Sequence, residues 1–492
     1  MTDIAPRSPV PHAGPELLAP AGSLAMLETA LAFGASAIYA GQPRYSLRTR
    51  NNDFGKLDAL ARGIDRTHAL GHKFYLVSNI YPHNAKLKTY LADMAPVMAL
   101  KPDALIMADP GLMLMIRETW PEMPIHLSVQ ANTVNHAAVR FWRQAGVSRV
   151  ILSREISLED IAEIRQECPD TELEVFVHGA LCVAYSGRCL LSGYFNHRDP
   201  NQGTCTNSCR WKYKVHPPGP LPEEGGAQAL PLGKLLDHPP NPLPGEGGNW
   251  SPPPLGGGGR EGVHSPAQAG CRQSLQPGGG DPYDDEFLIE EETRPGQLMP
   301  IEEDEHGTYI LNSKDLRAIE HVQRLVEIGV DSLKIEGRTK SPYYVARTCQ
   351  AYRRAIDDAV AGRPLDPRLV GELEGLANRG YTGGFYERHP DREHQNYLKG
   401  HSESGRSLYV GDVVAYGSDG LAEVEVKNRF AVGDRIELVH PSGNREMVIT
   451  TLQNRDGQPM NVAPGSGHRV HLALPPDLAG AFVARFIEPS HG

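Results

Sequence analysis

Four short apolar runs between residues 104 and 179 decide the fold: ALIMADP (104–110), IHLSVQAN (125–132), RVILSREI (149–156) and LEVFVHG (173–179). Each run is largely hydrophobic, and a helix-like segment separates it from the next. Strands that are apolar along their whole length are typical of parallel sheets, which are buried on both faces. The stretch therefore predicts consecutive βα units.

The same pattern continues on both sides of this stretch. Earlier runs are ELLAPAG (16–22), AIYAGQ (37–42) and KFYLVSNI (73–80), and an eighth, SLKIEGR (332–338), comes late. Eight βα units favour a closed (β/α)8 TIM-like barrel of the α/β class. An open doubly wound sheet fits the same alternation and is the alternative.

Helix-capping signals in the sequence agree with the prediction of βα units. Ser23 is placed to cap a helix over 24–33, Ser313 to cap one over 314–328, and Ser341-Pro342 to open one that ends at Gly362. Ser before the first helical residue, Pro at its first position and Gly after its last are the expected signals.

The remaining regions differ in character. We expect a disordered N-terminus (1–15), a barrel domain (16–362), a linker (363–404) and a small antiparallel β-barrel domain (405–492). The last domain is predicted from six alternating runs, LYVGDVVAY, AEVEVKN, DRIELVH, REMVITTL, HRVHLAL and AFVARF, which are separated by turns such as SDG and PSGN. Within the barrel domain, residues 217–280 hold 14 Pro and 16 Gly, which predicts a disordered insert.

Composition indicates a globular protein of the cytoplasm. The 492 residues are 40% hydrophobic, and no apolar run is long enough to span a membrane. The formal net charge is −11, but residues 281–305 hold eleven acids and one arginine, a local −10, so the rest carries −11 − (−10) = −1. Basic residues in the loop 44–50 and around the cysteines of 182–214 leave room for a phosphate-binding face.

Four of the seven cysteines, Cys182, Cys189, Cys205 and Cys209, fall within 28 residues. Thiols stay reduced in the cytoplasm, so this crowding indicates a metal site rather than disulfides. The spacing Cys-x6-Cys-x15-Cys-x3-Cys fits neither a zinc ribbon nor a bacterial ferredoxin run, and both zinc and an iron-sulfur cluster remain open. Cys182 follows the seventh predicted strand closely, which places the cluster on the barrel's functional rim.

The segment EVFVHGALCVAYSGRCLLSGYFNHRDPNQGTC (174–205) resembles the signature of peptidase family U32. Flanking sequence is similar as well, including HLSVQAN (126–132), EDEHGTYILNSKDLRAIEH (303–321) and the region from SLKIEGR onward. Within the family, the chain most resembles members that modify tRNA. This resemblance covers nearly everything outside the Pro/Gly-rich insert.

The resemblance implies an enzyme that converts the wobble uridine of tRNA to 5-hydroxyuridine without oxygen, with prephenate as the hydroxyl source. It also implies a [4Fe-4S] cluster on Cys182, Cys189 and Cys205. Some relatives have a fourth cysteine after a Ser-Lys-Asp-Leu motif, but here Arg317 stands at that position, which makes Cys209 the fourth ligand. Whether a partner protein supplies electrons stays open.

Four strand-end residues are candidates for the chemistry at the rim. Arg154 and Arg338 could hold the carboxylates of a prephenate-like acid by bidentate contacts. His178 and Glu336 are candidates for proton transfer. The alternatives are a structural histidine and a glutamate that pairs with a neighbouring arginine.

Two other functions compete with tRNA hydroxylation. The family's name suggests a peptidase, a collagenase-like protease, but the chain has no HExxH or GxSxG motif. A binding module with a structural zinc would also use four thiolates and would need no redox chemistry at the rim.

Overall fold

The computed structural model describes residues 14–41, 44–47, 52–181, 314–376, 380–387 and 407–487 with their side chains. Between 213 and 308 it describes only the backbone of five short strands, β8 to β12. By its internal contacts the chain divides into one unit made of 1–211 and 310–492 and a second made of 212–309. The four clustered cysteines and the insert 217–280 lie outside the described residues.

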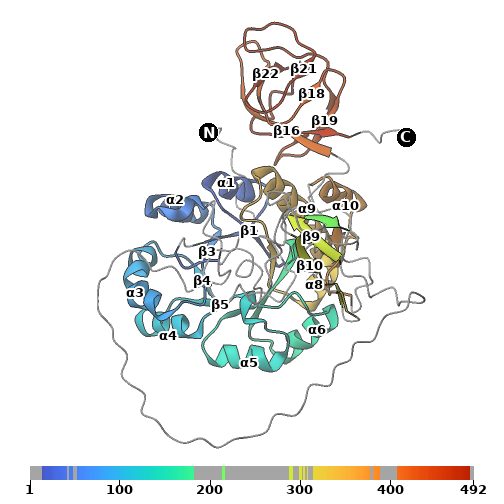
Figure 1. Ribbon diagram of the computed structural model, residues 1–492. Coiled ribbons are helices and arrows are strands. Elements are labelled where there is room, and N and C mark those ends of the chain that lie inside the picture. Colours follow the sequence, from blue (N-terminus) through green and yellow to red (C-terminus); the bar gives the residue numbers. More distant parts are fainter. Residues whose placement is uncertain are drawn as a thin grey trace, which may run out of the picture. The chain divides into compact units, whose positions relative to one another are not determined.

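Eight parallel strands close into a barrel (Figure 1). They are β1 (Glu16–Pro20), β2 (Ala37–Gly41), β3 (Lys73–Ser78), β4 (Ala104–Met107), β5 (Ile125–Leu127), β6 (Arg149–Ile151), β7 (Glu172–Ala180) and β14 (Ser332–Ile335). Consecutive strands pair in register, and β14 pairs with both β1 and β7. This closure confirms the predicted (β/α)8 barrel and excludes the open sheet.

Helices follow the strands around the outside of the barrel (Figure 1). They are α1 (Leu24–Ala32), α2 (Leu57–Ala69), α3 (Asn84–Met98), α4 (Pro110–Thr119), α5 (His136–Gln144), α6 (Leu158–Glu167), α8 (Val322–Ile328) and α9 (Pro342–Val360). The predicted caps at Ser23 and Ser341 are confirmed, since each hydroxyl accepts a hydrogen bond from the backbone N–H three residues on.

The prediction of one helix over 314–328 is wrong at its start. Residues Asp315–Arg317 form strand β13, a 3-10 turn covers Ile319–His321, and the helix α8 begins only at Val322. β13 pairs antiparallel with the end of β7 and parallel with β15 (Tyr381–Thr382). The backbone groups at the end of β7 need hydrogen-bond partners. Residues 315–317 supply them as a strand, although their local sequence favours a helix.

Inside the barrel, charged side chains replace part of the usual aliphatic filling. Glu16, Arg149 and Glu174 form one connected group, with Arg149 Nη1 at 2.6 Å from Glu16 and 3.2 Å from Glu174. Glu174 also accepts a hydrogen bond from Lys334 Nζ at 2.7 Å. The side chains of Arg149, Glu174 and Lys334 are at most 4% exposed, so these charges are compensated by one another rather than by water.

The C-terminal region contains a six-stranded antiparallel sheet in the order β20-β19-β23-β16-β17-β22. Its strands are β16 (Ser407–Tyr416), β17 (Ala422–Val426), β19 (Arg435–Val439), β20 (Arg445–Val448), β22 (Arg469–Leu472) and β23 (Phe482–Phe486), which match the six predicted runs. Strands β18 (Phe430–Ala431) and β21 (Val462–Ala463) form a separate pair. Residues including Val410, Val424 and Leu438 form a core of its own.

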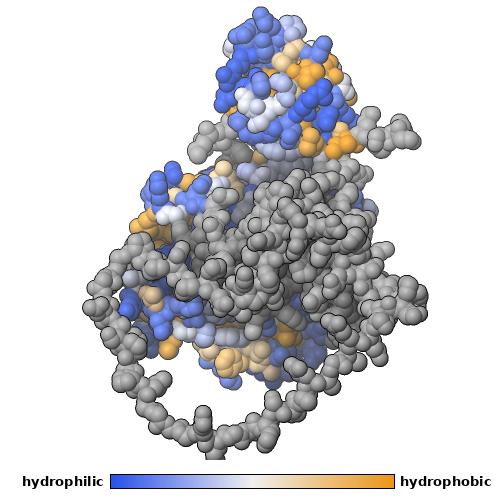
Figure 2. Space-filling model, viewed as in Figure 1, coloured by the Kyte–Doolittle hydropathy of each residue, from blue (hydrophilic) through white to orange (hydrophobic). Residues whose placement is uncertain are grey.

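The surface of this region carries no excess of positive charge. Residues 407–487 contain seven Lys or Arg and nine Asp or Glu, a net of 7 − 9 = −2. Figure 2 shows hydrophilic residues over much of its visible face, and Val432, Val448 and Ile487 are exposed hydrophobic residues of the region. Charge alone therefore gives no support for a phosphate-binding role here.

The segment 363–404, predicted as a linker, contains helix α10 (Pro367–Glu374) and strand β15. In the second unit, β8 (Tyr213–His216), β9 (Phe287–Glu291) and β10 (Leu298–Ile301) form an antiparallel sheet, and β11 (Glu303–Asp304) pairs with β12 (Gly307–Thr308). Among the helices that the structure describes, none is long and apolar enough to cross a membrane.

Candidate functional site

Three of the four predicted strand-end residues converge at the carboxyl end of the barrel. Arg154 Nη2 lies 3.9 Å from Glu336 Oε2, and the Tyr39 hydroxyl donates to the same oxygen at 3.3 Å. The Arg154 guanidinium stacks 3.8 Å above the ring of Phe176. Strands β2, β6, β7 and β14 thus each bring one side chain to a single charged cluster.

Arg338 reaches the same cluster from the loop after β14. Its guanidinium lies 5.9 Å from the centre of the Tyr39 ring. A Cβ on Gly41 would lie 2.3 Å from Arg338 Nη1 and 2.5 Å from Ser46 Oγ, so glycine at the end of β2 leaves the space that these side chains occupy. Ser46, which sequence reasoning had not singled out, is fully buried beside this arginine.

Lys334 lies below the cluster, one layer deeper in the barrel. Its ammonium is 4.4 Å from the centre of the Tyr39 ring and 5.4 Å from that of Phe176, while it donates to Glu174. Burial lowers the pKa of Lys334, and Glu174 opposes that shift. The rings of Tyr39 and Phe176, which contact Glu336 and Arg154, therefore pack against the buried Lys334–Glu174 ion pair.

The backbone beneath the cluster is closely packed. Gly179 has φ +109°, and a Cβ there would lie 2.4 Å from the carbonyl oxygen of Glu336. That same carbonyl accepts a hydrogen bond from the Tyr344 hydroxyl at 2.9 Å. Glycine at the end of β7 thus allows the close approach of the β14 end that holds Glu336 in place.

His178 lies apart from the other three predicted residues. In the pairing of β7 with β14, Phe176 is opposite Lys334 but His178 is opposite Ile335, so β7 has one extra residue at Val177. Such a bulge changes the face on which the next side chain emerges. The His178 ring consequently packs among Tyr344, Tyr352 and Tyr381, with Nδ1 3.3 Å from the Tyr352 hydroxyl.

The hydrogen bonds around Tyr352 fix the state of this histidine. The Tyr352 hydroxyl donates to the Val177 carbonyl at 2.6 Å and therefore accepts from His178 Nδ1. Burial lowers the pKa of His178 to about 3, so the ring is neutral with its proton on Nδ1. This geometry is that of a histidine that joins β7 to α9.

Neutral polar groups occupy the ends of β3 and β5. The Asn79 amide donates to Ser128 Oγ at 3.2 Å, and Ser128 donates to Gln130 Oε1 at 3.4 Å. All three residues are at least nine-tenths buried. The strand-end positions of Asn79 and Gln130 were predictable from the barrel, whereas their connection through Ser128 was not.

The predicted metal ligands, Cys182, Cys189, Cys205 and Cys209, fall outside the residues that the structure describes. Cys182 comes two residues after the end of β7 in sequence. Within the described ranges, no group of three or more His, Cys, Asp or Glu could hold a metal ion. Cys168 and Cys349 are free, buried thiols, and burial raises the pKa of Cys349.

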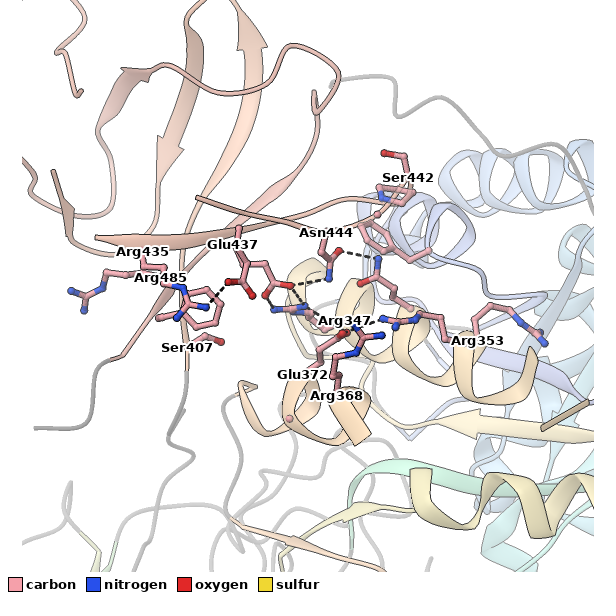
Figure 3. Close-up of a pocket in the computed structure, with 18 of the residues that line it drawn as sticks. Arg347, Arg353, Arg368, Glu372, Ser407, Arg435, Glu437, Ser442, Asn444 and Arg485 are labelled. Atoms are coloured by element: carbon pink, nitrogen blue, oxygen red, sulfur yellow. Dashed lines mark hydrogen bonds and ion pairs between the residues drawn. The ribbon is translucent and has the colours of Figure 1, made fainter. Parts of the chain in front are cut away.

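A cavity of about 1480 Å³ lies where α9 and α10 face the C-terminal sheet (Figure 3). Six arginines and five acidic side chains line it. Arg347 forms a bidentate ion pair with Glu437 of β19, and Asn444 donates to the same carboxylate at 3.0 Å. The positive and negative charges that line this cavity largely cancel. The cavity is therefore not a cationic groove that would bind a polyanion.

Comparisons with known proteins point to a family. The model of "Peptidase family U32" matches residues 22–396, and that of "Peptidase family U32 C-terminal domain" matches residues 406–485. The chain is 54% identical over 466 residues to "tRNA hydroxylation protein P" of Escherichia coli, covering 94% of each chain. The protein of the same name from Haemophilus influenzae is 52% identical over 467 residues, again covering 94% of each.

A more distant relative has a different name. "Collagenase" of Porphyromonas gingivalis is 26% identical over 448 residues, covering 87% of each chain.

Proposed function

We propose that this chain, which belongs to peptidase family U32, is a tRNA hydroxylase that converts the wobble uridine to 5-hydroxyuridine. The observation that carries this proposal is the identity above 50%, over 94% of both chains, to two proteins named for tRNA hydroxylation. The choice of the wobble uridine and of its C5 atom comes from the family resemblance. tRNA is then the macromolecular partner.

Hydroxylation at uracil C5 requires a redox group or an activated oxygen donor. The reaction replaces a vinylic hydrogen with oxygen, a net oxidation that ordinary side chains cannot perform as acids, bases or nucleophiles. Cys182, Cys189, Cys205 and Cys209 would hold a [4Fe-4S] cluster, since four thiolates are the usual donor set for it. When bound, such a cluster would supply one-electron transfer.

Prephenate is the proposed hydroxyl source, and its two carboxylates suit the charged cluster at the barrel mouth. Within the described ranges, the only acidic side chain within 4 Å of Arg154 is Glu336, at 3.9 Å. That distance is longer than a charge-assisted hydrogen bond, so the guanidinium keeps donors for a ligand carboxylate. Phe176 holds the plane of the guanidinium, and Arg338, whose guanidinium lies 5.9 Å from the centre of the Tyr39 ring, is the proposed partner of the second carboxylate.

Glu336 is the proposed group for proton transfer at this mouth. Its side chain is 11% exposed, accepts a hydrogen bond from Tyr39, and is attached to the backbone that Tyr344 and Gly179 fix. The His178 ring packs among Tyr344, Tyr352 and Tyr381 and donates its Nδ1 proton to Tyr352, so its proposed contribution is to hold β7 against α9.

The test is to purify the protein without oxygen and to measure iron, sulfide and zinc. Transfer RNA nucleosides from cells with and without the gene are then compared by mass spectrometry. We expect iron and sulfide in the protein, and 5-hydroxyuridine only where the gene is present. Zinc with unchanged 5-hydroxyuridine would reject the proposal in favour of a structural-zinc binding module.

Two cysteine variants make the metal measurement specific. Cys182→Ser should lose iron and activity together. Cys168→Ser is the matched control, because Cys168 is buried in the barrel domain and its thiol donates only to the His136 carbonyl at 3.5 Å, a bond that serine can also make. Equal iron loss in both variants would show that folding, rather than ligation, is affected.

A peptidase is the second candidate, favoured by the relative named as a collagenase. The same preparation tests it with a denatured collagen substrate. Cleavage that is lost in Cys182→Ser while iron is retained would support a cysteine nucleophile. The two described cysteines are poor nucleophiles, since both are buried.

A further inference from the structure

A directed series of hydrogen bonds crosses one half of the barrel mouth. It begins at the backbone N–H of Leu47, which donates to Asn79 Oδ1 at 3.2 Å. Asn79 Nδ2 donates to Ser128 Oγ at 3.2 Å, and Ser128 donates to Gln130 Oε1 at 3.4 Å. The series links the loop after β2 to the ends of β3 and β5.

The first donor fixes the orientation of the Asn79 amide. A backbone N–H can only donate, so the Asn79 atom that faces Leu47 is the oxygen and the atom that faces Ser128 is the amide nitrogen. The Ser128 hydroxyl, which accepts from Asn79, is then free to donate its proton to Gln130. In the structure, Gln130 turns its oxygen toward this hydroxyl and presents its nitrogen away from the series.

The Gln130 Nε2 group is buried and has no acceptor among the residues that the structure describes. Gln130 is only 3% exposed. An unsatisfied buried donor carries a desolvation penalty, and such groups are rare in folded proteins. The backbone cannot turn to relieve it, because the Gln130 carbonyl accepts from both the Tyr81 hydroxyl and the Asn132 amide.

The mouth therefore presents two chemically different groups of side chains. Arg154, Glu336 and Arg338 come from the ends of β6 and β14 and carry charge. Asn79, Ser128 and Gln130 come from the ends of β3 and β5 and are neutral. A dianionic acid matches the first group, whereas a neutral base with carbonyl acceptors matches the second.

We infer that Gln130 is a specificity-determining residue that donates a hydrogen bond from Nε2 to a carbonyl oxygen of the target uracil. This inference rests on the proposed function and names the contact by which the base is recognised. Uracil presents a carbonyl acceptor at C4, whereas cytosine presents an amino donor there. A rigid amide donor at this position accepts the first base and rejects the second.

Gln130→Glu tests the inference, because it keeps the shape of the side chain and replaces the donor with an acceptor. Synthetic anticodon stem-loop RNAs with uridine or cytidine at the wobble position are the probes, and binding and single-turnover hydroxylation are measured on the full-length, cluster-loaded protein. Gln144→Glu, at the exposed end of α5, adds the same charge as a control.

We expect Gln130→Glu to lower the single-turnover rate constant for hydroxylation of the uridine RNA by about tenfold or more. Binding of the cytidine RNA relative to the uridine RNA should rise, because a carboxylate accepts from the cytosine amino group. A residue with only a structural role would change the binding of both RNAs equally. Uridine activity within twofold of the control, or an unchanged preference between the two RNAs, overturns the inference.

Two further results separate the possible failures. If the unsubstituted protein neither binds nor hydroxylates the uridine RNA, the proposed function fails and this inference fails with it. If Gln130→Glu does not fold, Ser128→Ala takes its place, since it removes the hydroxyl that orients the Gln130 amide. That variant should weaken discrimination against cytidine RNA, and full discrimination would overturn the inference.

Discussion

Replacing Glu174 with glutamine should lower the free energy of unfolding by about 3 to 5 kcal/mol, the usual effect of removing one partner of a buried ion pair. The Glu174 side chain is fully buried and accepts from Lys334 Nζ at 2.7 Å. Arg149, its second partner, keeps Glu16 at 2.6 Å and Glu172 at 2.8 Å. Lys334, by contrast, has no other carboxylate within 4 Å in the described part of the chain, so the loss arises from this one uncompensated ammonium.

The opposite substitution is the matched control. Lys334→Met leaves Glu174 in contact with Arg149 at 3.2 Å, so its effect should be less than half that of Glu174→Gln. The double variant also removes the Lys334 ammonium, which Glu174→Gln alone leaves buried without a partner. It should therefore be more stable than Glu174→Gln alone. Urea unfolding followed by tyrosine and tryptophan fluorescence measures all three variants at pH 7.

The pH dependence of the same variant gives an independent check. Burial already lowers the pKa of Lys334, and loss of Glu174, which opposes that shift, should lower it further. A lysine with a folded pKa below its unfolded value binds its proton less well in the folded state, so stability rises as pH increases toward the unfolded pKa. The destabilisation by Glu174→Gln should therefore shrink between pH 7 and 10. A loss under about 1 kcal/mol at pH 7, or a double variant no more stable than the single one, would refute the reasoning.

Three more predictions concern the packing around the site. Because burial lowers the pKa of His178 to about 3, unfolding free energy should fall as pH drops from 6.5 toward 3, and His178→Gln should flatten that slope; an unchanged slope in urea unfolding would contradict it. Gly179→Ala, which places a Cβ 2.4 Å from a carbonyl oxygen at φ +109°, should lower the melting temperature more than Gly362→Ala, where φ is also positive but the space is open. Arg347→Met should increase amide hydrogen exchange in β19, unlike Arg368→Met on the exposed side of the same cavity; equal exchange would count against the ion pair as the contact that holds β19.

The sequence by itself determined the succession of strands and helices, whereas the pairing of β14 with β7 decided that they close into a barrel. Runs such as Ala104–Met107 are apolar along their length, and Ser23 and Ser341 supply caps that act within one turn of helix, so these features depend on neighbours in the chain. The strand ends, and with them Arg154, Glu336 and Arg338 at one mouth, follow from the barrel's geometry. Local patterns also located the six strands of the C-terminal sheet.

Only the tertiary structure decided three other features. Asp315–Arg317 became a strand because the end of β7 offered unpaired backbone groups, which no local pattern in 314–328 records. Alternation along β7 places His178 on the same face as Glu174 and Phe176, but the extra residue at Val177 turns it toward α9. Glu174 and Lys334 are 160 residues apart, and so are joined only when β14 closes the barrel against β7. In each case the partner lies far along the chain, where sequence periodicity carries no information.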